Sequence, residues 1–135
     1  MNNVVLVGLV IVFAVILFGA MAVVKRKTSG LKREYFVRRW NDLQNLLSSN
    51  EGMKLAVIEA DKLLDEALKQ LHFKGGTMGE RMVSAQKSFK KADSVWMAHK
   101  LRNKIVHETD FAPKKQHIHS ALVSFRQALK DLGAL

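Results

Sequence analysis

The chain has no cysteine, no strand-like segment and few acidic residues, and each shortage restricts what it can be. The absence of cysteine excludes disulfides and thiolate zinc sites. No segment alternates apolar and polar residues as a half-buried strand does, so the fold is predicted to be all-α. The 12 Asp and Glu are outnumbered by 22 Lys and Arg, and the formal charge of +10 favours acidic partners such as anionic lipid head groups or RNA.

Residues 4–24, from Val4 to Val24, form an apolar stretch with no charged residue and no proline. A helix of that length rises about 30 Å, the thickness of a bilayer's hydrocarbon core, so we expect a single transmembrane helix. A cleaved signal peptide is the alternative, although the chain starts without a cation. Lys25, Arg26 and Lys27 follow directly. The positive-inside rule then places the amino terminus outside and the rest of the chain in the cytoplasm, at the inner (plasma) membrane.

Residues 1–27 are therefore predicted to be a transmembrane anchor with a basic flank, and residues 28–135 one cytoplasmic domain. Short connections within this domain predict an up-and-down bundle of four to five helices with antiparallel neighbours. Apolar residues recur at helical spacing in successive segments, which lie near 31–49, 51–72, 77–89, 93–110 and 113–132.

Several residues mark the expected helix ends. Residues 74–76 contain two glycines and predict a turn, after which Thr77 begins a capping box. Asp93 or Ser94 is expected to cap the next helix. Gly133 is expected to end the last one.

Arg102 lies within the apolar arc of its predicted helix. The residues seven and four positions before it, and three and four positions after it, are all apolar. A guanidinium in these surroundings requires a carboxylate partner or a cleft, because burying it unpaired is costly. Asp61, however, falls with Asp65 on the face of residues 51–72 that we expect to be exposed. The acids considered as partners are Asp61, Asp65, Glu59 and Glu80.

Arg102, Asn103 and His107 form the candidate catalytic or binding site. Asn103 and His107 are four positions apart and share a helix face, and Arg102 is long enough to reach round to it. A guanidinium grips phosphate oxygens, an amide orients them, and an imidazole moves a proton near neutral pH. These residues therefore predict a phosphate ligand.

This arrangement resembles the R-N-x-x-x-H motif of HEPN domains, which are helical bundles that carry the motif late in a helix. The resemblance implies binding of RNA or nucleotide phosphate, and in some members metal-independent ribonuclease activity across a homodimer. In that case His107 would move the proton of the attacking 2′-hydroxyl or of the leaving group. Arg102 would stabilise charge on the phosphate, and Asn103 would hold the geometry. Segments that resemble small bacterial proteins with an N-terminal anchor are residues 56–65, 76–81 and 98–108.

A second interpretation is a non-catalytic, membrane-tethered helical module that binds an unidentified protein partner. It expects Arg102 to pair with an acid of the second or third cytoplasmic helix and His107 to close a helix end. The first interpretation instead expects Arg102 and His107 to be exposed together in a cleft. The position of these two side chains therefore separates the two functions.

The sequence indicates neither a metal site nor a cofactor. His117 and His119 are two positions apart, point in different directions on a helix and are interpreted as surface residues. Gly75 and Gly76 precede a helix, but the longer phosphate-loop pattern that ends in Lys and Ser or Thr is missing. We interpret this segment as a plain turn.

Overall fold

The structure, a computed structural model, describes residues 3–28 and 30–135. The described residues form α-helices and short 3-10 helices, with no strand among them. The chain divides into two compact units, Met1–Gly30 and Leu31–Leu135, and each is described by itself.

The first unit contains α1, Asn3–Thr28. Within the described residues no helix is both long enough and apolar enough to cross a membrane, so the transmembrane helix predicted over residues 4–24 is corrected. The single-pass topology inferred from that helix fits poorly with this finding.

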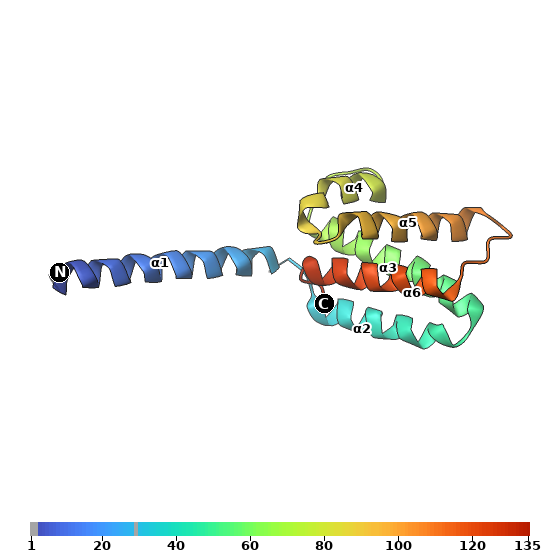
Figure 1. The fold of residues 1–135 in the computed structure, drawn as a ribbon, viewed down its shortest axis with the longest axis horizontal. Helices are drawn as coiled ribbons and strands as arrows, with labels where there is room; N and C mark the ends of the chain where they lie inside the picture. The colour runs from blue at the N-terminus through green and yellow to red at the C-terminus, as the bar shows by residue number, and fades with distance from the viewer. Residues whose placement is uncertain (1–2, 29) are drawn as a thin grey trace. The chain divides into compact units, whose positions relative to one another are not determined.

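The second unit is a helical bundle, as predicted (Figure 1). Its four long helices alternate in direction along the chain (Figure 1). They are α2 (Arg33–Gln44), α3 (Asn50–Gln70), α5 (Ala92–His107) and α6 (Lys115–Asp131). The shorter elements are α4 (Met78–Ser84) and the 3-10 helices η1 (Asn45–Ser48) and η2 (Gln86–Ser88). Because α3 packs against α2, α4, α5 and α6, it is the central helix.

The core consists of the apolar stripes that helical spacing predicted. Burial of one Leu or Phe side chain contributes about 2 kcal/mol, so these stripes supply the main driving force for folding. Small side chains on α3 let the neighbouring helices approach closely, and Ala56, Ala60 and Ala67 are all fully buried. The large buried side chains include Phe36 and Trp40 of α2, Val57, Leu64 and Leu68 of α3, Met82 of α4, and Phe125 and Leu129 of α6.

Two helix ends form where the sequence placed them. Thr77 Oγ1 accepts a hydrogen bond from the Glu80 amide at 3.2 Å and starts α4. Beyond α6, Gly133 has a φ of 78°, which favours glycine. The amides of Gly133 and Ala134 donate to carbonyls of the last turn, as in a Schellman motif. Gly133 therefore ends α6, as predicted.

The start of α5 differs from its prediction. The helix begins at Ala92, after Lys91, whose side chain makes no capping hydrogen bond. Neither Asp93 nor Ser94 is the N-cap, so that prediction is wrong. Asp93 lies instead in the first turn, where a carboxylate interacts favourably with the helix dipole without capping an amide.

A buried ion pair holds α4 against α3. Arg81, which is 7 % exposed, donates from Nε and Nη2 to the Asp65 carboxylate at 2.7 and 3.0 Å. Its Nη1 donates to the carbonyl of Gly75 at 2.7 Å, and Lys69 Nζ lies 3.0 Å from Asp65. Burial opposes ionisation of Asp65, but the hydrogen bonds from Arg81 and Lys69 outweigh it, so the pKa of Asp65 lies below its usual range.

We expect part of the loss of stability in acid to come from Asp65. Its pKa is lower in the folded chain than in the unfolded chain, so its contribution is present above the unfolded pKa of about 3.9 and is lost as pH falls through the folded value. Urea denaturation of the full chain at about pH 7 and about pH 3 measures this loss. Asp65→Asn should lose less unfolding free energy between the two pH values than the wild type. Asp42→Asn, which changes an exposed acid, should lose as much as the wild type. Equal losses in all three proteins would contradict the role of Asp65.

Candidate functional site

Four polar side chains meet between α3 and α5, and we call Asp61, His99, Arg102 and Asn103 the Asp61 cluster. Asp61 belongs to α3 and is only 2 % exposed. Its Oδ1 lies 2.7 Å from His99 Nδ1, and its Oδ2 lies 3.4 Å from Arg102 Nε. Asp61 is thus the carboxylate partner that the apolar surroundings of Arg102 required. The expectation that Asp61 would lie on an exposed face is wrong.

Hydrogen bonds within the cluster favour one tautomer of His99. An ionised Asp61 carboxylate only accepts, so His99 Nδ1 is the donor in their bond. Asn103 Oδ1 accepts from Arg102 Nη1 at 2.9 Å, which leaves Asn103 Nδ2 to donate to His99 Nε2 at 3.3 Å. These contacts fit the His99 tautomer that carries its proton on Nδ1. The charges of Asp61 and Arg102 then balance.

Exposure within the cluster increases from α3 outward. The side chain of Asp61 is 4 % exposed, that of His99 is 12 % exposed and that of Arg102 is 24 % exposed. The Nε atom of Arg102 is buried without a hydrogen-bond partner among the described residues. At 3.4 Å its attraction to Asp61 is ionic rather than a directed hydrogen bond. The cluster is thus an enclosed contact between helices with one partly open edge at Arg102.

Trp96 covers one side of the cluster. Its ring lies edge-on to the His99 ring, with 6.0 Å between the centroids. Such a T-shaped contact restricts the rotation of the imidazole. The contacts of His99 with Asp61, Asn103 and Trp96 give this side chain a positioning role in the cluster.

The structure brings together only part of the predicted site. Arg102 and Asn103 belong to the Asp61 cluster, whereas His107 is the last residue of α5 and is exposed. Among the described residues, His107 takes no part in the hydrogen bonds of the cluster. A catalytic or phosphate-binding role for these three residues stays a prediction.

The two histidines of α6 and the glycine turn before α4 were also considered as possible binding sites from the sequence. His117 and His119 are both exposed, as expected for surface residues. Within residues 3–28 and 30–135 no group of three metal-ligating side chains is close enough to hold an ion. Gly75 has a φ of 154° in the turn before α4, and a Cβ there would lie 2.6 Å from the Arg81 amide. This turn therefore requires glycine for a structural reason.

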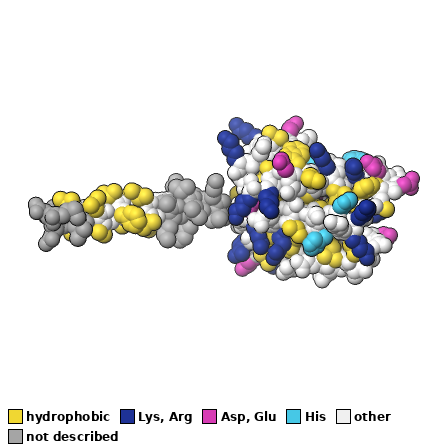
Figure 2. All heavy atoms as spheres, viewed as in Figure 1, with side chains coloured by type: hydrophobic (Ala, Val, Ile, Leu, Met, Phe, Trp, Pro, Cys, Tyr) yellow, Lys and Arg dark blue, Asp and Glu magenta, His cyan; other side chains and the backbone are white. Residues whose placement is uncertain are grey.

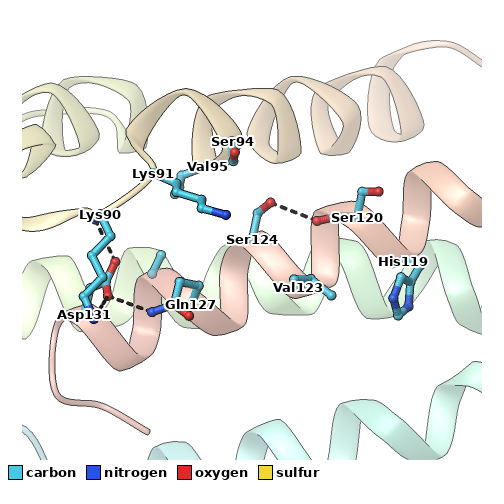
Figure 3. A pocket seen from close by; sticks show the side chains of 11 residues that line it. Lys90, Lys91, Ser94, Val95, His119, Ser120, Val123, Ser124, Gln127 and Asp131 are labelled. Atoms are coloured by element: carbon cyan, nitrogen blue, oxygen red, sulfur yellow. Dashed lines mark hydrogen bonds and ion pairs between the residues drawn. The ribbon is translucent and has the colours of Figure 1, made fainter.

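Sequence analysis did not identify a groove between α5 and α6. Two cavities of about 480 and about 520 Å³ share Ser94, Ser120 and Ser124 in their linings, so we treat them as one α5–α6 groove. Figure 3 shows the first cavity, with Lys91 extending between the two helices. Met97 and Val123 line the groove and are 71 % and 53 % exposed. Apolar and basic side chains also lie next to one another on the surface of the bundle in the view of Figure 2.

Comparisons of the chain with models of known protein families, with curated protein sequences and with solved structures give no match. The resemblance to HEPN domains rests on Arg102, Asn103 and His107 and on the helical architecture. Two features of the described bundle bear on function, namely the Asp61 cluster and the α5–α6 groove.

We expect Asp61→Ala to destabilise the bundle by about 3 kcal/mol, because it removes the carboxylate that both His99 and Arg102 contact and leaves a guanidinium without its partner. Chemical denaturation of the full chain measures this change. Asp42→Ala removes an exposed carboxylate and should change stability by less than about 0.5 kcal/mol. Equal stability of the two variants would show that the Asp61 cluster contributes little to the fold.

Proposed function

We propose that the bundle is a non-catalytic protein-binding module that holds its partner in the α5–α6 groove. The observation that carries this proposal is the exposure of large apolar side chains beside the groove. Met97 is 71 % exposed on α5 and Val123 is 53 % exposed on α6. Single exposed apolar residues are common, but these two line adjoining cavities, and such grouping is typical of interaction surfaces.

The pairing of Arg102 with Asp61 supports the same proposal. The protein-binding interpretation expected this arginine to pair with an acid of the second or third cytoplasmic helix, and Asp61 of α3 is that acid. It also expected His107 to close a helix, and His107 is the last residue of α5. Because Asp61 balances the charge of Arg102, the Asp61 cluster has little net charge to attract an anion.

Substitution of Met97 tests the protein-binding surface. Full-length chain carrying Met97→Glu should no longer retain proteins that the wild type binds from an extract of the cells that make it, because a carboxylate in the groove opposes burial of the interface. Quantitative mass spectrometry of the bound fraction measures retention. Val83→Glu makes the same change at a side chain that is 59 % exposed on α4 and should retain the same proteins as the wild type. The proposal is wrong if no protein depends on Met97 while being unaffected at Val83.

A second candidate function is binding of an RNA or nucleotide phosphate, with metal-independent cleavage as an extension. It is supported by the 24 % exposure of the Arg102 side chain and by the exposed His107, one turn beyond Asn103 on α5. In this reading Arg102 contacts the phosphate from the open edge of the Asp61 cluster. A second copy of the chain would complete the site, as the HEPN resemblance implies.

Incubation of the full chain with single-stranded RNA in EDTA separates the two functions. The second candidate predicts that binding or cleavage is present in the wild type and falls at least about tenfold in Arg102→Ala and His107→Ala proteins that keep their helical circular dichroism. His119→Ala, which changes an exposed histidine outside the motif, should keep the wild-type level. A wild type that neither binds nor cuts RNA rules out the second candidate and leaves the protein-binding module.

A further inference from the structure

We infer that the partner presents an acidic amphipathic helix of about four turns, which lies along the α5–α6 groove between the two helices. This inference rests on the proposed function and specifies the chemistry of the partner. The geometry of the groove, its apolar lining and the charge along its edges each support it.

The groove runs along the contact line of α5 and α6 and can accommodate a third helix. Two antiparallel helices that pack side by side leave a furrow along their line of contact, and a helix with an apolar face fits such a furrow. On α6 the lining extends from His117 to Asp131, a rise of about 21 Å. A partner helix of about 14 residues would cover this length. Ser94, Ala98, Ser120 and Ala121 line the furrow, and their small side chains leave room for the apolar side chains of a partner.

Met97, the most exposed apolar side chain of α5, faces this furrow rather than the Asp61 cluster. Met97, Leu101 and Lys104 are spaced by four and three residues and therefore share one face of α5. At 100° per residue that face lies opposite the one that carries Arg102 and Asn103. Methionine adapts its shape to a partner and is frequent at helix-binding grooves. The face of α5 that is not used for the internal cluster is thus available to a partner.

The edges of the groove are basic. Among the described residues, the one acid in its lining is Asp131. The Asp131 side chain is 3 % exposed and accepts hydrogen bonds from the Lys90 amide and Gln127 Nε2, each at 2.9 Å. Lys90 Nζ lies 3.9 Å from this acid and the Lys90 side chain is 78 % exposed, so its charge is little neutralised. Lysines at four positions therefore flank an apolar furrow, which complements a helix with acidic residues beside its apolar stripe. These lysines are Lys90, Lys91, Lys100 and Lys104.

Three other candidate occupants of the groove, namely a second copy of the chain, its own α1 and RNA, complement the groove less well than an acidic helix does. A second copy of the chain carries the same formal charge of +10 and would be repelled. The α1 sequence of the chain itself contains no acidic residue to meet the lysines. Single-stranded RNA stacks best on large exposed rings, but the largest ring of the groove, Phe111, is partly buried and has Lys104 Nζ 5.8 Å from its centroid. His117 and His119 are the exposed rings of the lining, so competition with RNA is included in the test below.

A peptide display selection tests this inference directly. The probe is a library of randomised peptides of about 16 residues, selected on the full chain held in mild detergent because α1 exposes apolar side chains. We expect the enriched peptides to carry acidic residues beside apolar residues spaced by three and four, and to become helical on binding. Fluorescence anisotropy should show about tenfold weaker binding to Lys100→Glu than to the wild type, and weaker binding at high salt. Lys87→Glu, the same change at an exposed lysine outside the groove, should alter binding less than about twofold.

The outcomes separate this inference from the proposed function. Enriched peptides that are basic or neutral but still require Met97 would overturn the acidic-helix inference while leaving a protein-binding groove. Peptides that bind Lys100→Glu as tightly as the wild type, or a selection that enriches none, would also overturn the inference. The extract experiment with Met97→Glu and Val83→Glu then decides the proposed function by itself. Selective binding of single-stranded RNA in competition with the peptides would assign the groove to nucleic acid and overturn the inference.

Discussion

The packing of the bundle depends on one buried carboxylate in its central helix. Asp61 lies in the middle of α3, which contacts every other helix of the bundle, and its charge must be compensated where it stands. The side chains that compensate it, His99 and Arg102, both come from α5. This requirement acts together with apolar packing to fix the axial position and rotation of α5 against α3, because the 2.7 Å hydrogen bond between His99 and Asp61 is directional.

The constraint at Asp61 divides α5 into two functional faces. The inner face carries His99, Arg102 and Asn103 and is occupied by contacts within the chain. The outer face carries Met97 and Leu101 and lines the α5–α6 groove. A helix that is fixed in register on one side presents a rigid surface on the other. Such a surface loses little conformational entropy when it binds a partner.

The sequence contained enough information for the bundle but not for all of its contacts. Helical spacing identified the buried stripe of α3 and α6 because apolar residues there repeat over several turns. The apolar surroundings of Arg102 predicted a carboxylate partner or a cleft, and Asp61 was among the acids named, yet Asp61 was placed on an exposed face. The test that found Arg102 examined the residues seven and four positions before it and three and four positions after it. Around Asp61 those positions hold Lys54, Val57, Leu64 and Asp65, and because two of the four are charged, this test would not have found the burial of Asp61.

Other features require the tertiary structure. The α5–α6 groove depends on which face of each helix meets the other, and spacing within one helix does not determine this. The small residues Ser94, Ser120 and Ser124 were its only sequence signal, and they lie in segments distant along the chain. The start of α5 at Ala92 likewise has no side-chain cap to mark it. For α1, the prediction depended on the full run of residues 4–24, and the described part supports no helix that crosses a membrane.

The contacts of Arg81 have a consequence for how the molecule opens. This one guanidinium reaches Asp65 of α3 and the carbonyl of Gly75, so it joins the short α4 and its preceding turn to the central helix. A helix of 7 residues has little stability of its own and stays folded through such tertiary contacts. With this pair broken, α4 would be held on the bundle mainly by its buried Met82, whereas α2, α3, α5 and α6 keep their larger apolar contacts. The bundle thus contains a segment that can exchange its amide hydrogens through local opening, independently of global unfolding.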